Sequence, residues 1–140
     1  MGKLHRELIE DLTEAFKMKT VLLVDDDNSV VLTIGTRLKS MGYAVVAAKD
    51  AVAAISTFRK NKPDVVVLDI SMPAGDGFGV ADRLQSFDGF AAAPIIFITS
   101  SEDPAIRARA MKHGVAFFRK PIDAGQLASA IESALSRSDN

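Results

Sequence analysis

The sequence predicts an α/β fold: a doubly wound, five-stranded parallel sheet with an extra helix at the amino terminus. Three observations support this. Short apolar runs rich in β-branched residues alternate with segments of helical periodicity. The segments between runs are long enough to hold a helix, as connections between parallel neighbours require. Charged or hydroxyl-bearing residues follow several runs at their carboxyl ends, which is where open parallel sheets bind ligands.

Length and composition fit one globular domain. The chain has 140 residues, 48% of them hydrophobic and 25% charged, and it contains no cysteine. A net charge of -1 gives no reason to expect nucleic acid or an anionic membrane as a partner. No apolar run approaches the roughly 20 residues that cross a bilayer, and the first residues do not form a signal-peptide core. We therefore expect a cytoplasmic protein.

Residues 3–18 predict an amphipathic helix. Its apolar side chains recur every fourth residue, at Leu4, Leu8, Leu12 and Phe16, with charged residues between them. A polar joint follows, so residues 1–18 are expected to form a helix or linker and residues 19–140 the domain. The stripe could dock on the domain, pair with a second copy in a homodimer, or continue a coiled segment from an upstream module; as a further alternative, it could fray.

The first half of the domain follows the alternating pattern. Residues 21–24 predict a strand buried on both faces. Asp27 or Asn28 can cap the next helix, and Gly42 stands where a left-handed terminator belongs. Residues 43–47 predict the second strand.

Asp50 can cap the following helix, and Pro63 precedes the third strand at residues 65–68, which Asp69 closes. A turn-rich loop follows, in which Asp76 can cap a short helix.

The second half continues in the same way. Pro94 introduces a strand at residues 95–98, and the pair Asp103-Pro104 has the order of a helix start. Gly114 ends that helix before the fifth strand, residues 115–118. Asp123 with Gln126 then predicts a capping box for the last helix, and the polar tail after residue 135 is expected to fray.

The strand order 2-1-3-4-5 gathers the polar residues at the strand ends. In this order the winding reverses between strands one and three, and ligands bind beyond the carboxyl ends at that reversal. Asp25, Asp26 and Asp69 would surround the crevice, with Thr99 and Lys120 to one side. Singly, each of these residues is as readily explained as a helix cap, a strand end or a surface residue; their joint placement indicates a site.

With these residues in place, the sequence resembles the receiver domain of two-component response regulators, which has a flavodoxin-like fold. The motifs that carry the likeness keep the family's order and spacing from about residue 19 to residue 137. They are Val24-Asp25-Asp26, Leu68-Asp69, Met72-Pro73 with Asp76-Gly77, Thr99-Ser100 and Lys120-Pro121.

The resemblance implies that Asp69 is the phosphoacceptor for a sensor histidine kinase or a histidine phosphotransfer protein. It implies that Asp26 and Asp69 bind Mg²⁺, that Asp25 helps through water, and that the backbone carbonyl of Ser71 completes the ligands. A carboxylate that attacks a phosphoryl group needs a hard cation to offset the repulsion between them. Lys120 would supply a positive charge and Thr99 a hydroxyl donor for phosphoryl oxygens. The Lys120-Pro121 bond is expected to be cis.

By the same resemblance, Thr99 and Phe117 form a conformational switch. Phosphorylation would draw Thr99 inward and move Phe117, which changes the face of the domain's fourth helix, fifth strand and fifth helix for an unknown downstream protein. Many family members carry tyrosine where Phe117 stands, so partner contacts through a phenol are not expected here. Ser71 and Ser101 are small and neither could steer water, so partners rather than fast hydrolysis would set the lifetime of the acyl phosphate.

The preferred hypothesis is a phosphoacceptor module and not an enzyme, but alternatives stay open. The chain could be a receiver excised from a hybrid histidine kinase or from a longer regulator. A Mg²⁺-dependent aspartyl phosphatase would share the chemistry, although Ser71 stands where such enzymes often carry a second aspartate. A nucleotide- or flavin-binding protein should show a glycine-rich loop after its first strand, where this chain has acids. A purely structural domain would bind no Mg²⁺.

Overall fold

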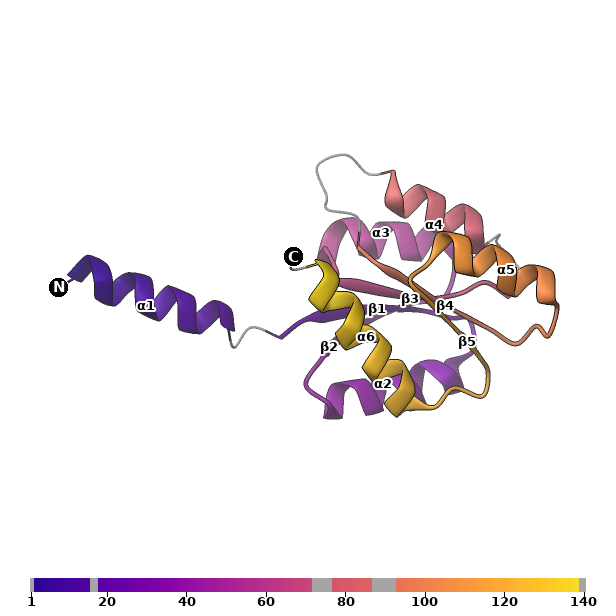
Figure 1. Ribbon diagram of the computed structural model, residues 1–140, viewed down its shortest axis with the longest axis horizontal. Helices are drawn as coiled ribbons and strands as arrows, with labels where there is room; N and C mark the ends of the chain where they lie inside the picture. Colours follow the sequence, from indigo (N-terminus) through magenta and orange to yellow (C-terminus); the bar gives the residue numbers. More distant parts are fainter. Residues whose placement is uncertain (1, 16–17, 72–76, 87–92, 139–140) are drawn as a thin grey trace.

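The computed structural model describes residues 2–15, 18–71, 77–86 and 93–138. Its centre is a five-stranded parallel sheet in the order β2-β1-β3-β4-β5, covered by helices on both faces (Figure 1). The strands are β1 (Thr20–Val24), β2 (Ala44–Ala48), β3 (Val65–Asp69), β4 (Ile95–Thr99) and β5 (Ala116–Arg119). The helices are α1 (Gly2–Ala15), α2 (Asn28–Ser40), α3 (Ala51–Asn61), α4 (Gly77–Gln85), α5 (Pro104–His113) and α6 (Ala124–Ser138). The predicted fold class, strand order and amino-terminal helix are confirmed.

The core has two layers, one on each face of the sheet. Along β1, Val21 and Leu23 pack with α2 and α6, while Leu22 and Val24 pack with residues of α3, α4 and α5. Every residue of β3 and β4 is buried, as expected for central parallel strands covered on both faces. Because these strands are parallel, their carboxyl ends meet at one edge of the sheet.

The predicted helix caps are largely confirmed. Three aspartates each accept a backbone N–H of the helix that follows: Asp27 from Ser29 at 2.9 Å, Asp50 from Ala53 at 2.8 Å and Asp103 from Ala105 at 2.9 Å. Asp123 caps α6 by accepting the Gln126 N–H at 2.9 Å. Gly42 has φ +98°, the left-handed conformation expected after α2. The predicted cap at Asp76 lies outside the described residues.

Several predicted boundaries shift. Strand β2 begins at Ala44 instead of Tyr43, because the Tyr43 N–H donates to the Leu38 carbonyl and closes the end of α2. Strand β5 likewise begins and ends one residue later than predicted. The prediction that the tail frays after residue 135 is wrong for residues 136–138. These belong to α6, where Ser136 Oγ donates to the Glu132 carbonyl at 3.0 Å.

Helix α1 projects away from the domain (Figure 1). It begins at Gly2 and ends at Ala15, and Met18, which was predicted to be its last residue, lies outside it. Its apolar residues Leu4 and Leu8 are exposed. Among the described residues, none of the helices combines the length and the apolar character that a bilayer span requires.

Candidate functional site

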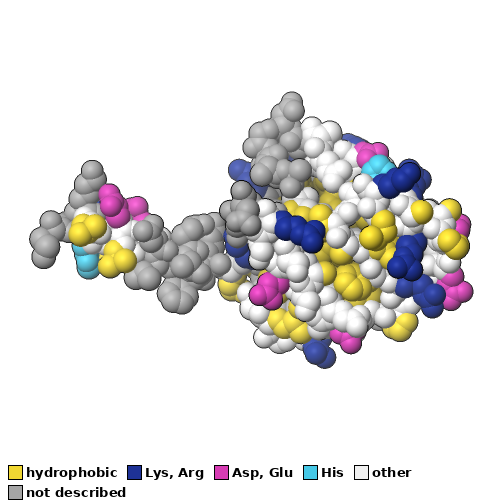
Figure 2. Space-filling view, viewed as in Figure 1, with side chains coloured by type: hydrophobic (Ala, Val, Ile, Leu, Met, Phe, Trp, Pro, Cys, Tyr) yellow, Lys and Arg dark blue, Asp and Glu magenta, His cyan; other side chains and the backbone are white. Residues whose placement is uncertain are grey.

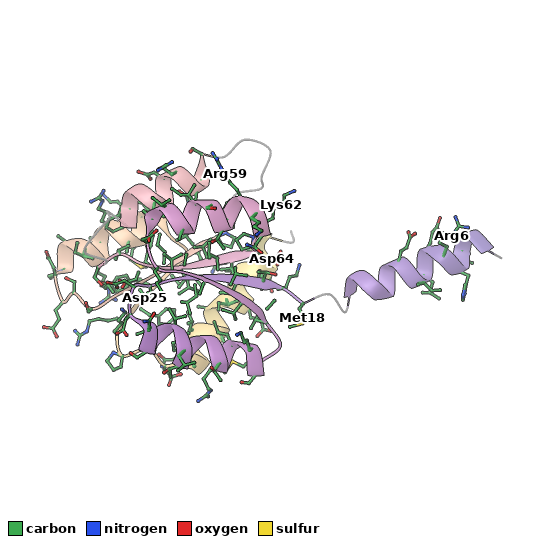
Figure 3. The ribbon with its side chains drawn as sticks, turned by 180° about the vertical axis from the view of Figure 1, so that it is seen from behind. Arg6, Met18, Asp25, Arg59, Lys62 and Asp64 are labelled. Atoms are coloured by element: carbon green, nitrogen blue, oxygen red, sulfur yellow. The ribbon has the colours of Figure 1, made fainter. Side chains whose placement is uncertain are left out.

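Three carboxylates meet at the carboxyl edge of the sheet. Asp25 and Asp26 directly follow β1, and Asp69 ends the neighbouring strand β3, where Leu68 is in register with Val24. One carboxylate oxygen from each lies within 4.8 Å of the other two. In Figure 3 the labelled Asp25 lies at the end of the domain opposite Met18, where the chain enters β1. The structure thus brings together the three acids that the sequence singled out.

The three acids have different surroundings. Asp25 and Asp69 are buried, whereas Asp26 is exposed. Asp25 Oδ1 accepts the Asp27 N–H at 2.9 Å, and Asp25 Oδ2 faces the ammonium of Lys120 at 2.8 Å. Burial raises the pKa of Asp25, the charge of Asp69 raises it further, and Lys120 acts in the opposite direction. A buried carboxylate in this state favours a nearby cation.

Lys120 supplies one such cation. It follows β5, two strands away from β3, and its Nζ lies 2.8 Å from Asp25 Oδ2 and 3.1 Å from Asp69 Oδ2. Burial alone would lower the pKa of the Lys120 ammonium, but its contacts with the two carboxylates outweigh burial and raise that pKa. The ammonium therefore stays charged. The Lys120-Pro121 bond is cis, as predicted.

Ser71 contacts Asp69 with more than its backbone. Both its N–H, at 2.8 Å, and its hydroxyl donate to Asp69 Oδ1. Ser100 approaches the same hydroxyl with its N–H at 3.4 Å and its Oγ at 3.3 Å. Sequence reasoning named Ser71 for its carbonyl and for its small size, and it missed the hydroxyl contact with Asp69. The role of the Ser71 carbonyl as a metal ligand stays a prediction.

Thr99 and Phe117 lie on adjacent strands. Thr99 is fully buried, and its Oγ1 accepts the Ser101 N–H at 3.0 Å. Its partner in the β4–β5 register is Arg119, so Phe117, two residues earlier, shares a face of the sheet with Thr99. Phe117 is half-buried and packs against the core on the side of α3, α4 and α5. It also lines a cavity of about 350 Å³ together with Ser101, Glu102, Asp103, Pro104, Arg107 and Arg119.

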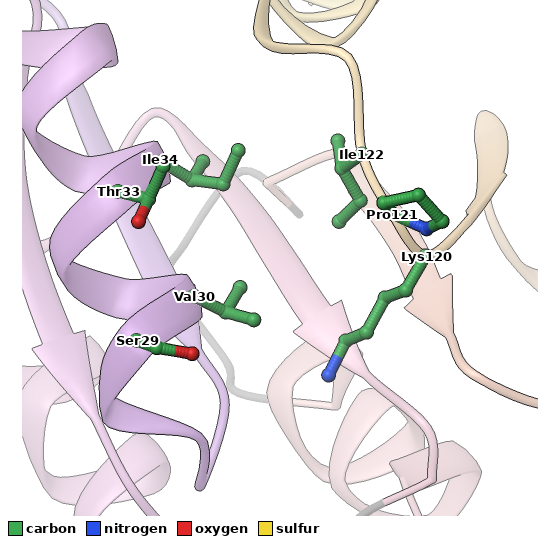
Figure 4. A pocket seen from close by; sticks show the side chains of 7 residues that line it. All are labelled: Ser29, Val30, Thr33, Ile34, Lys120, Pro121 and Ile122. Carbon is green, nitrogen blue, oxygen red and sulfur yellow. The ribbon is translucent and has the colours of Figure 1, made fainter.

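A second cavity, of about 200 Å³, lies beside Lys120. Figure 4 shows Lys120, Pro121 and Ile122 facing the residues of α2 across it. The α2 residues that line it are Ser29, Val30, Thr33 and Ile34. The sequence did not predict this cavity. The available signal was Ile122, an apolar residue that directly follows Lys120-Pro121.

The donor set fits a hard divalent cation. Three carboxylates share this edge with a single ammonium, so the described cluster carries excess negative charge. Oxygen ligands of this kind suit Mg²⁺ or Ca²⁺ better than softer metals. Asp26 is exposed and gives access from solvent, while the buried Asp25 Oδ2 already faces the Lys120 ammonium at 2.8 Å. This acidic cluster could therefore bind a metal.

Comparisons with known proteins show the family to which this sequence is similar. The family model of the response regulator receiver domain matches residues 21–132. A probable transcriptional regulator ycf27 from Cyanophora paradoxa is 37% identical over 123 residues, which are 87% of this chain and 50% of that protein. A gliding motility regulatory protein from Myxococcus xanthus is 33% identical over 111 residues, 78% of this chain and 14% of that protein. The chain thus spans about half the length of the ycf27 relative.

Among solved structures, a response regulator receiver domain protein from Clostridium thermocellum superposes with a TM-score of 0.79. Its sequence identity is 26%, and the match covers 87% of this chain and 98% of that one. The family model covers residues 21–132, so it leaves out α1 and the last residues of α6.

Proposed function

The chain belongs to the response regulator receiver domain family, and from this premise we propose that Asp69 accepts a phosphoryl group from a histidine kinase or a histidine phosphotransfer protein. The observation that carries the proposal is the convergence of Asp25, Asp26 and Asp69 within 4.8 Å, with the Lys120 ammonium against two of them. Residues 19–140 form the receiver domain in this proposal, and residues 1–18 form an appended helix or linker.

Asp26 and Asp69 would hold Mg²⁺ directly, Asp25 would act through water, and the Ser71 carbonyl would complete the protein ligands. When bound, the cation supplies charge neutralisation between the carboxylate and the incoming phosphoryl group. The excess negative charge of the three carboxylates over the single Lys120 ammonium supports this assignment. The identity of the metal as Mg²⁺ is part of the proposal.

In the transfer step, an oxygen of Asp69 forms a bond to phosphorus while the bond from phosphorus to the imidazole nitrogen of the donor breaks. The electron pair of that bond returns to the imidazole, and an acyl phosphate remains on Asp69. Lys120 is positioned to neutralise a phosphoryl oxygen because its Nζ already lies 3.1 Å from Asp69 Oδ2. The apolar cavity between α2 and Pro121-Ile122 offers a surface on which a donor protein can rest.

The output in this proposal is a switch at Thr99 and Phe117. The buried Thr99 hydroxyl would leave its contact with the Ser101 N–H and donate to the phosphoryl group. Phe117 shares that face of the sheet and would then move within the surface formed by α5, β5 and α6. Figure 2 shows hydrophobic side chains gathered on the face where these elements lie, which suits a protein partner.

The test is labelling of the purified chain with acetyl phosphate, followed by intact-mass measurement and mapping of the modified peptide. We expect one phosphoryl group per chain, on Asp69, in the presence of Mg²⁺ and none in the presence of a chelator. Asp69→Asn should abolish labelling, whereas Asp103→Asn, which keeps a capping side chain on α5, should not. Rapid turnover of the donor without an accumulated phosphoprotein would instead identify a phosphatase.

A further inference from the structure

Helix α1 presents apolar side chains that its own domain does not cover. Leu4 is 72% exposed and Leu8 is 56% exposed. Figures 1 and 2 show the helix standing away from the domain with hydrophobic side chains on its surface. A helix of 14 residues is marginal in water by itself and gains most of its stability from packing. Packing of the exposed apolar face of α1 against another protein surface would therefore stabilise this helix.

The spacing of the stripe favours a crossed groove over a coiled coil. Leu4 and Leu8 are four residues apart, and the sequence repeats this interval at Leu12 and Phe16. A coiled-coil seam needs alternating steps of three and four, because its repeat averages 3.5 residues. A row with a constant step of four is inclined to the helix axis and fits the groove of a helix pair that it crosses.

The domain offers such a groove between α3 and α4. A cavity of about 480 Å³ lies there, with Val52 and Ile55 as its apolar lining. Val52 is 79% exposed, more than the other large hydrophobic residues recorded on the described surface. The rest of the lining is Ser56, Arg59, Lys60 and Arg83. The groove thus combines the exposed Val52, beside the buried Ile55, with a cationic rim.

The charges of the helix and of the groove are complementary. Within α1 the sequence has four acids and two cations: Glu7, Glu10, Asp11 and Glu14 against Lys3 and Arg6. Within α3 and α4 it has three cations and one acid: Arg59, Lys60 and Arg83 against Asp82. Glu7 and Asp11 each follow a residue of the stripe by three positions, Leu4 and Leu8, so they flank the stripe, and its docking would bring them toward the rim.

The groove of the same chain is hard for α1 to reach. Ala15 and Thr20 are five residues apart, and five extended residues span at most about 18 Å. Thr20 is fixed by its N–H, which donates to Asp64 Oδ2 at 2.7 Å. A helix lying on α3 and α4 would be two packed layers above the sheet, at about 8–10 Å per layer. That distance equals the full span of the extended segment from Ala15 to Thr20. The groove of a second copy does not have this restriction.

We propose that α1 of one copy binds the α3–α4 groove of a second copy, and that the exchange is reciprocal and makes a homodimer. The two-fold arrangement uses the same pair of surfaces twice, so it closes and does not extend into a filament. The groove and α1 do not include Asp25, Asp69 or Lys120, so the dimer does not depend on the proposed phosphoryl transfer.

The test uses two charge-reversal variants of the full chain, studied by sedimentation velocity over a range of concentrations. One variant carries Glu7→Lys and Asp11→Lys, and the other carries Lys60→Glu and Arg83→Glu. The unmodified chain should dimerise, and each variant alone should dimerise at least tenfold more weakly. An equimolar mixture should regain the dimer, because in a mixed dimer each α1 meets a groove of opposite charge.

Lys112→Glu reverses an exposed cation on α5 and is the matched control, which should dimerise like the unmodified chain. Far-UV circular dichroism of each variant checks that the fold is kept. The proposal is overturned if the unmodified chain is monomeric at every concentration, as docking within one chain requires. Unchanged dimerisation of the Lys60/Arg83 variant also overturns it, since that result would indicate pairing between two α1 helices.

Discussion

Lys120 Nζ lies closer to Asp25, at 2.8 Å, than to Asp69, the proposed phosphoacceptor, at 3.1 Å. The ammonium thus sits between two buried carboxylates that end neighbouring strands. Its side chain is 18% exposed, and those of Asp25 and Asp69 are 0% and 2% exposed. Without the Lys120 ammonium, the two buried carboxylates would repel each other at low dielectric, and its positive charge would no longer offset theirs. The same cation therefore contributes to folding and to the proposed chemistry.

Lys120→Met is expected to destabilise the chain by about 3 kcal/mol in the absence of Mg²⁺, because it leaves buried carboxylates uncompensated. Arg119→Met is the matched control. The ion pair of Arg119 with Glu102 is largely solvent-exposed, so its loss should change stability by less than about 1 kcal/mol. Urea unfolding with a chelator present measures both variants, and equal midpoints would contradict the role given to Lys120.

The elements that the sequence predicted best are those set by local pattern. Buried parallel strands appear in the sequence as apolar runs, so β1, β3 and β4 could be predicted. An aspartate directly before a helix is typical of an N-cap, so the caps at Asp27, Asp50 and Asp103 could be predicted as well. Convergence of the site followed from topology alone, since parallel strands place their carboxyl ends at one edge.

Features that depend on side-chain rotamers or on register could not be predicted. The Ser71 hydroxyl could face solvent or Asp69, and only the packed loop decides between them. Lys120 could have paired with Asp69 alone. The start of β2 moved because the Tyr43 N–H completes the turn after α2, and one hydrogen bond of this kind leaves no trace in hydropathy.

Mg²⁺ is expected to stabilise the chain through Asp26. A ligand at 100 times its dissociation constant adds about 2.7 kcal/mol to the free energy of unfolding. Asp26→Asn should remove most of this Mg²⁺-dependent gain and change the stability without Mg²⁺ little, because Asp26 is exposed. Thermal unfolding across a Mg²⁺ titration is the measurement. Asp50→Asn removes a nearby charge but keeps a cap, so it should leave the Mg²⁺ response intact.

Gly114→Ala is expected to destabilise the domain for steric reasons. A methyl group at Gly114 would lie 2.6 Å from Phe97 Cδ2 and 2.8 Å from the Ile95 carbonyl oxygen, and neither can yield easily inside β4. Overpacking of this kind costs about 1–3 kcal/mol. Gly35→Ala, in the interior of α2, is the comparison. Its methyl group would lie 3.9 Å from Val45 Cγ1 of β2, an ordinary contact, so this variant should stabilise the domain by about 0.5–1 kcal/mol. Similar unfolding midpoints for the two variants would refute the argument.

Ser71→Ala is expected to speed phosphoryl transfer to Asp69. The Ser71 hydroxyl donates to Asp69 Oδ1, and this bond must weaken if that oxygen attacks phosphorus. A hydrogen bond contributes about 1 kcal/mol, so its removal should raise the rate of labelling by acetyl phosphate up to about fivefold. The Ser71 N–H, which also donates to Oδ1 at 2.8 Å, remains and keeps the carboxylate oriented.

Ser101→Ala is the matched control for this variant. The Ser101 hydroxyl accepts the Asp103 N–H at 3.1 Å, and the described contacts do not include one between it and Asp69. Its labelling rate should therefore stay close to that of the unmodified chain. A lower rate for Ser71→Ala would mean that the hydroxyl helps to hold the carboxylate in its reactive orientation. An unchanged rate would mean that Oδ2, the oxygen next to Lys120, is the one that attacks.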